Sequence, residues 1–200
     1  MSLVGKSAIN FSAKAVMQDN SIDSDFNLKN YVRDSKCVLF FYPLDFTFVC
    51  PSEIIAFNNK LDEFKKRNTK VVGISVDSHF CHIAWKKTRY SDGGIESIQF
   101  PLISDLNKEI SKAYDVLLEQ EGIALRGTFI IDTNFVVRHV TVNDLPLGRS
   151  VEESIRIIDA IDHHTHYGEV CPAGWNVGKN AMKPTVEGVS EYLSKNNSDL

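Results

Sequence analysis

Four cysteines are the residues of this sequence that could carry nucleophilic chemistry, and their number and spacing limit what they can do. They are scattered along the chain, at Cys37, Cys50, Cys81 and Cys171. Four are too few and too dispersed to form a disulfide framework in a chain of 200 residues. No two of them form a CxxC pair, which argues against a structural zinc site. Whether any of these thiols is reactive therefore depends on the residues around it.

Cys50 has the sequence surroundings of a reactive thiol. It follows an apolar run that ends at Pro43, and Pro51 comes directly after it. Proline is favoured at the first position of a helix, and the Glu53 carboxylate suits the first turn, so we expect a helix to begin at Cys50. The positive end of a helix lowers the pKa of a thiol from about 8.5 into a range of roughly 3.5–7.5. Position alone leaves the alternative, a buried and inert cysteine, equally open.

Three other groups invite a chemical interpretation, but a structural one is favoured for each. Cys37 opens an apolar strand and is predicted to lie in the core. Cys81 stands between two histidines, but such closely spaced residues diverge on a helix and do not form a tetrahedral metal site. Asp162 and His166 have the i,i+4 spacing that could hold a metal. Histidines at the negative end of a solvated helix are the simpler explanation.

The elements that must position Cys50 follow an alternating pattern of strands and helices. Apolar runs at 37–42 and 70–76 are continuous, as expected of strands buried on both faces. Two more runs, 127–131 and 135–141, are separated by a short polar turn, as in a hairpin. Apolar residues at helical spacing predict helices around residues 54–64, 83–85, 110–114 and 151–161. This order predicts an α/β fold with a central mixed sheet.

The composition is that of an ordinary soluble domain, with 43% hydrophobic and 24% charged residues. The net charge of −4 argues against an electrostatic nucleic-acid binder. The longest apolar run, 38–42, is far shorter than a membrane span, and residues 1–6 lack the features of a signal peptide. We therefore expect a cytoplasmic protein that binds neither nucleic acid nor membrane. In that reducing compartment a disulfide would be transient and catalytic.

Regular patterns fade after about residue 166. Glycines and prolines interrupt the sequence from there until a short terminal helix expected over 186–193. We therefore predict one domain over residues 1–166 and a C-terminal arm over residues 167–200 that is suited to packing on another subunit.

The residues around Cys50 closely resemble the active-site loop of typical two-cysteine peroxiredoxins, the alkyl hydroperoxide reductase C and thioredoxin peroxidase family. The loop reads DFTFVCPSE over residues 45–53, with the spacing PxxxTxxC from Pro43 to Cys50. Four further segments resemble other blocks of that family, in the same order: residues 75–85, 124–127, 143–149 and 168–175. Five ordered blocks are a very specific match, and together they cover the chain from near residue 4 to about residue 193.

The resemblance implies a thioredoxin-like fold and thiol peroxidase activity with no metal, haem or flavin cofactor. Cys50 would be the peroxidatic thiolate, which attacks the peroxide and becomes a sulfenic acid. Thr47 would offer its hydroxyl to the thiolate and the peroxide, and Arg126 would supply a fixed cation for the developing charge. Pro43 would shield the pocket from water, and Glu53 would orient the arginine.

Cys171 resembles the resolving cysteine of the family. By resemblance it would attack the Cys50 sulfenic acid of a partner chain, and an external dithiol would reduce the resulting intersubunit disulfide. The family also implies hydrogen peroxide and organic hydroperoxides as substrates. It further implies a head-to-tail homodimer that can form a decamer, and thioredoxin or a flavoprotein disulfide reductase as the electron donor.

The sequence departs from the family at two places, and two other functions stay open. The GGLG segment of easily overoxidised members reads GGIE at residues 93–96, and their C-terminal Tyr-Phe pair reads Tyr192-Leu193. These departures predict an enzyme that is comparatively robust to overoxidation. The other functions are a chaperone or peroxide-signalling scaffold and a thiol–disulfide oxidoreductase. The latter usually needs CxxC, whereas Glu53 occupies the corresponding position here.

Overall fold

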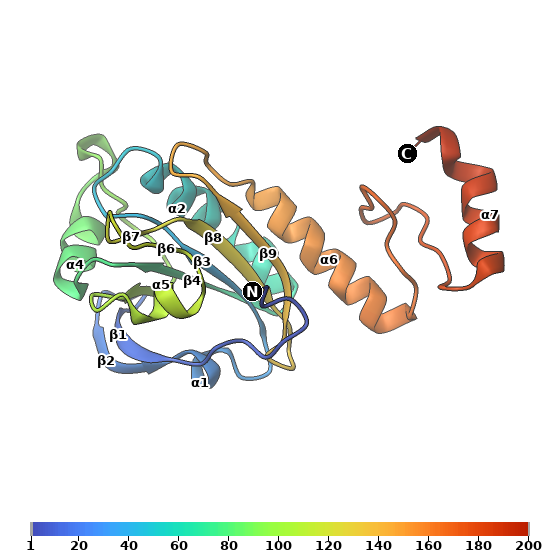
Figure 1. Ribbon diagram of the computed structural model, residues 1–200. Helices are drawn as coiled ribbons and strands as arrows, with labels where there is room; N and C mark the ends of the chain where they lie inside the picture. The colour runs from blue at the N-terminus through green and yellow to red at the C-terminus, as the bar shows by residue number, and fades with distance from the viewer. Residues whose placement is uncertain (1, 200) are drawn as a thin grey trace. The chain divides into compact units, whose positions relative to one another are not determined.

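The computed structural model describes residues 2–199, which divide into two compact units, one ending at Val151 and one beginning at Glu152. The first unit is built on a seven-stranded sheet with the order β2-β1-β5-β4-β3-β8-β9 (Figure 1). Its strands are β1 (Ser12–Val16), β2 (Ile22–Asn27), β3 (Lys36–Phe41), β4 (Thr69–Ser75), β5 (Leu102–Ser104), β8 (Arg126–Ile131) and β9 (Val137–Asn143). A separate two-stranded sheet joins β6 (Leu117–Leu118) to β7 (Ile123–Ala124).

Helices of the first unit cover both faces of the large sheet. They are α1 (Leu28–Val32), α2 (Cys50–Asn59), α3 (Leu61–Lys66), α4 (His79–Lys87) and α5 (Glu109–Ala113), with a 3-10 turn at Tyr90–Asp92. Strand β3 pairs in parallel with β4 and antiparallel with β8, so the sheet is mixed. The predicted α/β architecture with a central mixed sheet is therefore confirmed.

The central strand β3 explains where the helices pack. All six of its residues are buried, and successive side chains of a strand point to opposite faces. On one face Phe40 stacks on Phe57 of α2, with 4.5 Å between ring centroids. On the other face Phe41 packs against Tyr114 and Phe129, at 5.3 and 5.7 Å between centroids. Helix α2, which begins at Cys50, is thus fixed to the sheet through Phe57.

The sequence predicts some of the elements of this unit and misses others. The single helix expected over residues 54–64 is two helices, which meet at Lys60, where the backbone leaves the helical conformation (φ −105°, ψ 8°). Polar residues interrupt β1 at Ser12 and Lys14 and make up most of β2, and β5 has only three residues, so none of these strands shows a long apolar run. The hairpin between β8 and β9 is confirmed, and its turn places Phe135 at a φ of 61°.

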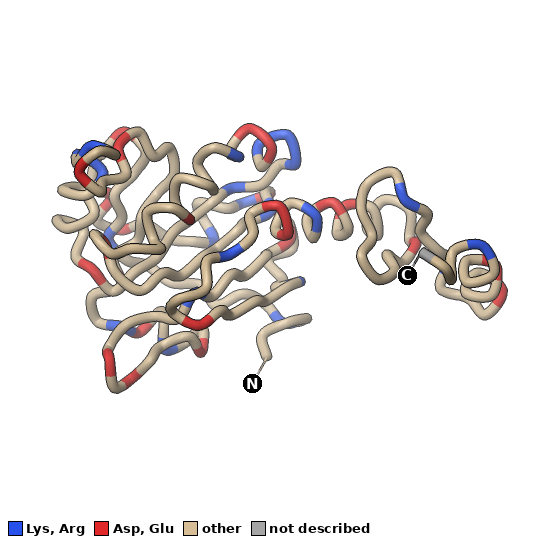
Figure 2. The backbone as a smooth tube through the Cα atoms, turned by 90° about the horizontal axis from the view of Figure 1, so that it is seen from above, with Lys and Arg blue, Asp and Glu red and all other residues tan. Residues whose placement is uncertain are grey.

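The second unit contains α6 (Val151–Tyr167, beginning at the boundary) and α7 (Val186–Asn196), followed by a 3-10 turn at Asn197–Asp199. The sequence placed the division after residue 166, because helical periodicity fades there. The compact units divide between Val151 and Glu152, so α6 after its first residue lies in the same unit as the segment that follows it. The boundary of a C-terminal arm after residue 166 stays a prediction. Acidic and basic residues are interspersed along both units (Figure 2). None of the helices formed by residues 2–199 has the length and apolar character needed to cross a membrane.

Candidate active site

Cys50 is the first residue of α2, as the sequence predicts. Pro51 occupies the first turn, Glu53 supplies an acidic side chain to that turn, and Val49 offers no side-chain cap. The free backbone N–H groups of this helix end therefore surround Cys50 with positive potential. The cysteine is fully buried, so a reactant must be small or the helix start must open to admit it.

Thr47 lies against the Cys50 sulfur. Its Oγ1 is 2.9 Å from Cys50 Sγ and 2.8 Å from the carbonyl oxygen of Leu44. A hydroxyl has one proton to donate and lone pairs that accept. Thr47 can donate to Leu44 while it accepts the thiol proton, and it can rotate to donate to the sulfur once Cys50 is ionised. The hydroxyl thus suits both protonation states of the thiol.

Arg126 brings a buried cation to the same sulfur from the first position of β8. Its Nη1 lies 3.3 Å from Cys50 Sγ and donates to Glu53 Oε2 at 2.7 Å. Its Nε donates to the carbonyl oxygen of Leu145 at 2.7 Å. Two anchors therefore fix the guanidinium while one nitrogen faces the sulfur, which places Cys50, Thr47, Glu53 and Arg126 together.

Arg149 is a member of this cluster to which the sequence assigned no role. Its Nε and Nη2 donate to the two carboxylate oxygens of Glu53 at 2.8 and 2.9 Å. Its Nη1 donates to the backbone carbonyls of Phe41 and Gly127 at 2.7 and 2.9 Å. Burial lowers the pKa of Arg149, an effect that Glu53 opposes and the nearby Arg126 reinforces. The sequence did contain one indication that Arg149 is important, because it is the last residue of the segment 143–149 that resembles the family.

The charges of this cluster do not cancel. Arg126 and Arg149 are each only 4% exposed as side chains, and they share one carboxylate, that of Glu53. Two guanidinium groups and one carboxylate leave one net positive charge in a buried site. An anion at Cys50, whether a thiolate or a reacting oxygen, balances that charge without further solvent.

The loop before Cys50 is held by a second buried network. Pro43 is buried at the start of this loop, and Asp45 anchors its middle. The Asp45 carboxylate accepts from Tyr42 Oη at 2.9 Å and lies 2.8 Å from His82 Nδ1. The Asp45 amide donates to Asp77 Oδ2 at 2.8 Å. Asp45 thus connects the loop before Cys50 to helix α4 and to the end of β4.

Phe46 shows that this loop is conformationally constrained. Its φ of 54° lies in the left-handed region, which is costly for a bulky residue. The Asp45–Asp77 hydrogen bond precedes it, the Thr47–Leu44 hydrogen bond follows it, and its ring packs 5.7 Å from that of Trp85. These contacts hold the backbone turn that directs Thr47 toward Cys50.

The other cysteines of the first unit lie in environments that keep them protonated. Cys37 is buried in the core, as predicted, and burial raises its pKa to about 12. Burial also raises the pKa of Cys81 to about 12, with further contributions from Asp45 and Asp77. Among residues 2–199, the only group of three or more potential metal ligands consists of Asp45, Asp77 and Cys81. Asp45 and Asp77 already accept hydrogen bonds from protein donors, so they do not need a metal ion to be satisfied.

Cys171 lies in the second unit, in the irregular segment between α6 and α7. It is half-buried, with its Sγ 3.6 Å from the carbonyl oxygen of Ala160. Burial raises its pKa; the nearby Arg156 opposes this effect and Glu169 adds to it. The structure thus places this thiol in an irregular segment, where burial favours its protonated form.

Comparison with known proteins gives consistent matches along the chain. Residues 4–140 match the AhpC/TSA family, and residues 160–195 match the C-terminal domain of 1-Cys peroxiredoxin. An alkyl hydroperoxide reductase C of Buchnera aphidicola subsp. Acyrthosiphon pisum (strain APS) is 51% identical over 98% of this chain and 99% of its own. Peroxiredoxin-1 of Gallus gallus is 52% identical over 96% of both chains.

Solved structures agree with the sequence matches. The reduced 2-Cys peroxiredoxin of Plasmodium vivax has a TM-score of 0.94 and 52% identity, covering 97% of this chain and 100% of its own. The mitochondrial 2-Cys peroxiredoxin of Plasmodium falciparum has a TM-score of 0.80 and 50% identity, over 85% of this chain and 100% of its own. Together with the mixed sheet and its flanking helices, these likenesses confirm the expected thioredoxin-like fold.

Proposed function

The chain belongs to the AhpC/TSA family of peroxiredoxins and is a thiol-dependent peroxidase, and on this premise we propose that Cys50 is the peroxidatic cysteine and Cys171 the resolving cysteine. The observation that carries the proposal is the position of the Cys50 sulfur, 2.9 Å from Thr47 Oγ1 and 3.3 Å from Arg126 Nη1. A hydroxyl and a fixed cation on one thiol suit a reaction in which negative charge moves from sulfur to oxygen.

In the first step the Cys50 thiolate attacks the terminal oxygen of a hydroperoxide. An S–O bond forms, the O–O bond breaks, and the sulfur becomes a sulfenic acid. The leaving alkoxide or hydroxide takes a proton and departs as alcohol or water. The net positive charge of the Arg126–Glu53–Arg149 cluster stabilises both the thiolate and the developing oxyanion. Pro43, buried beside the loop, limits access of water.

In the second step the Cys171 sulfur of a partner chain attacks the Cys50 sulfenic acid. A disulfide forms between the two chains, and the sulfenic oxygen leaves as water. Two electrons from an external dithiol then restore both thiols. Cys171 must leave its half-buried position to react, and the irregular segment that carries it suits such a movement.

The proposal also covers the oligomeric state, the electron donor and the location of the protein. The active unit is a homodimer, and five dimers can form a decamer. Thioredoxin or a flavoprotein disulfide reductase is the electron donor. A similar protein, Prx1a of Plasmodium yoelii, forms an artifactual octamer when it is modified at the N-terminus. The proposed location is the cytoplasm. Sizing chromatography and fractionation of cells test these two points.

Peroxide consumption by single-cysteine variants tests the assignment of the two cysteines. With a thioredoxin system or a flavoprotein reductase as donor, Cys50→Ser should consume no peroxide. Cys171→Ser should reduce one peroxide per chain and then stop, and it should form no dimer band on a non-reducing gel. Cys37→Ser is the matched control and should keep full turnover. Sustained turnover by Cys50→Ser, or loss of turnover in the control alone, would contradict the proposal.

A further inference from the structure

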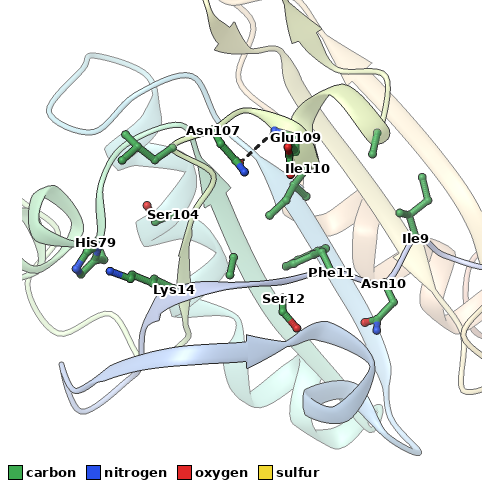
Figure 3. A pocket seen from close by; sticks show the side chains of 13 residues that line it. Ile9, Asn10, Phe11, Ser12, Lys14, His79, Ser104, Asn107, Glu109 and Ile110 are labelled. Atoms are coloured by element: carbon green, nitrogen blue, oxygen red, sulfur yellow. Dashed lines mark hydrogen bonds between the residues drawn. The ribbon is translucent and has the colours of Figure 1, made fainter.

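Where β1 and β5 separate, they leave a hollow in the first unit that the peroxidase site does not use. The two strands pair from Lys14 opposite Ser104 to Val16 opposite Leu102. Before Lys14 and after Ser104 the chains diverge, because residues 105–108 lead into α5. The space between them has a volume of about 670 Å³ (Figure 3). We call it the β1–α5 hollow, and its size is typical of small-molecule sites.

The floor of the β1–α5 hollow is apolar. Ile9 and Phe11 line it from the segment before β1, and Ile110 and Ala113 line it from α5. Ile110 belongs to the buried core, and Ile9 and Phe11 pack against that core. The hollow therefore exposes one side of well-packed apolar residues, which a ligand with an extended hydrocarbon chain can cover.

One end of the hollow is cationic. Figure 3 shows the Lys14 side chain directed toward His79 at this end, while Glu109 lies on the α5 side. Within the described chain Lys14 makes no ion pair, and His79, although only 9% exposed, makes no hydrogen bond through its ring nitrogens. Burial, the Lys14 ammonium and His82 together lower the pKa of His79, so its ring is a neutral N–H donor at pH 7. No buried side-chain nitrogen or oxygen of the described residues lacks a hydrogen-bond partner, so the unbonded ring nitrogens of His79 are accessible to solvent. Together with the Lys14 ammonium they offer accessible donors to an anionic head group at this end of the hollow.

The charge at this end selects among anions. One ammonium beside a neutral imidazole offers a single positive charge and N–H donors from two side chains. A singly charged carboxylate matches that charge, whereas a doubly charged phosphate monoester would exceed it, and Glu109 disfavours a second anionic group on the α5 side.

We propose that the β1–α5 hollow binds a linear fatty carboxylate, with its head group on Lys14 and His79 and its acyl chain over Phe11, Ile110 and Ala113. None of the residues of the Cys50 cluster lines this hollow. Binding is therefore independent of the proposed roles of Cys50 and Cys171, and it can be measured in a protein that has no peroxidase activity.

Calorimetric titration of the reduced, full-length protein with octanoate, decanoate and dodecanoate at pH 7.5, below micelle formation, tests the proposal. We expect one site per chain and an affinity that rises roughly threefold for each added methylene. Lys14→Gln should weaken dodecanoate binding about tenfold or more. Lys87→Gln, which removes an exposed lysine of α4 outside the hollow, is the matched control and should leave it unchanged. Ala113→Phe should weaken dodecanoate more than octanoate, because the new ring occupies the floor.

Several results would overturn the proposal. Equal affinity for dodecanol and dodecanoate would show that the head group is not recognised. Equal affinity for octanoate and dodecanoate would show that the acyl chain does not contribute to binding. An equal effect of Lys14→Gln and Lys87→Gln would mean that overall charge alone attracts the anion. Cys50→Ser protein should bind dodecanoate as the parent protein does, so the result holds whatever the outcome of the peroxidase test.

Discussion

Arg126 and Glu53 form an ion pair of 2.7 Å in which only 4% and 2% of the two side chains are exposed. The Arg126 nitrogen that bonds the carboxylate also faces the Cys50 sulfur at 3.3 Å. Glu53 therefore fixes the direction of the guanidinium, and Arg149 holds Glu53 from its other side. The relationship makes Arg126 a preorganised donor to a Cys50 thiolate and to the oxygen that gains negative charge in the proposed reaction.

Arg126→Gln should slow the reaction of Cys50 with hydrogen peroxide roughly 100- to 1,000-fold, because it removes the charged donor beside the sulfur. Stopped-flow tryptophan fluorescence of the reduced protein measures the second-order rate constant. Arg138→Gln is the matched control, since Arg138 pairs with Asp132 and is 47% exposed. An equal loss of rate in both variants would show that the effect is not specific to the site.

Glu53→Gln should destabilise the protein by about 3–5 kcal/mol, because two buried guanidinium groups lose their shared carboxylate. Urea unfolding at pH 7 measures the free energy. Glu63→Gln, at a partly exposed carboxylate that pairs with Lys66 and Arg67, should cost less than about 1 kcal/mol. If both variants unfold at the same urea concentration, Glu53 does not compensate the buried charges.

The sequence predicts the position of Cys50 but not the full cluster around it. A helix start is encoded locally, and Pro51 and Glu53 lie within three residues of the cysteine. Arg126 is 76 residues from Cys50 along the chain and Arg149 is 96 residues from Glu53, and both reach the site by contacts that only the folded sheet creates. The family resemblance supplied the first of them. The resemblance gave no role to Arg149. Its hydrogen bonds to Glu53 and to the carbonyls of Phe41 and Gly127 form only when the fold brings these groups together.

The strands also differ in how far their own residues reveal them. Strand β3 is buried along its whole length and is evident as a continuous apolar run. In contrast, only Ala15 and Val16 of β1 are buried, and Ser12 and Lys14 interrupt its apolar residues, so the sequence shows no continuous apolar run there. Its strand conformation comes from pairing with β2 and β5, which the sequence alone does not display.

Lys86→Met should stabilise the protein at pH 7 by about 1–3 kcal/mol. The Lys86 ammonium is buried and donates to the Met17 carbonyl at 2.6 Å, and burial lowers its pKa to about 8, which Asp19 only partly offsets. The pKa in the unfolded chain is about 10.4. Between pH 8 and 10 the unfolded chain therefore binds more protons, and the stability of the parent protein rises with pH.

Urea unfolding at pH 7 and pH 9.5 tests this pH dependence. The advantage of Lys86→Met should shrink at the higher pH, because the buried amine of the parent protein is then neutral. Lys87→Met, at the exposed neighbouring position, should show no such change. An advantage that is equal at both pH values would show that the gain comes from packing rather than from removal of a buried charge.

His163→Ala should speed formation of the proposed Cys50–Cys171 disulfide several-fold. His163 Nε2 lies 3.0 Å from Glu169 Oε2, and its ring lies 4.8 Å from the ring of Trp175, so it holds the segment on both sides of Cys171. Loosening this segment frees the half-buried thiol without altering the peroxide step. Quenched-flow sampling on non-reducing gels measures the rate of dimer formation.

His166→Ala provides the control for this prediction. His166 is exposed on the same helix and contacts Tyr167 rather than the segment around Cys171. Its removal should leave the rate of dimer formation unchanged. Slower dimer formation in His163→Ala would mean that the contact prepares the arm for reaction instead of restraining it.

Leu193→Phe should make Cys50 more sensitive to overoxidation. The Cys50 sulfenic acid either condenses with Cys171 or reacts with a second peroxide to give the irreversible sulfinic acid. The outcome depends on how often the start of α2 opens, and the family resemblance assigns the restraint partly to an aromatic residue at position 193. Leu193 is 44% exposed on α7 and has no ring, so it should clamp weakly. Weakening a clamp by about 1.4 kcal/mol raises a minor open population roughly tenfold.

Mass spectrometry of Cys50 during turnover, across a series of peroxide concentrations, measures the two fates. The parent protein should show little sulfinic acid at micromolar peroxide, whereas Leu193→Phe and Glu96→Gly should each shift its appearance to lower concentrations. Val186→Phe is the control, because it adds a ring to the same helix at a position that is 83% exposed. Abundant sulfinic acid in the parent at micromolar peroxide, unchanged by Leu193→Phe, would show that the restraint on α2 does not depend on this residue.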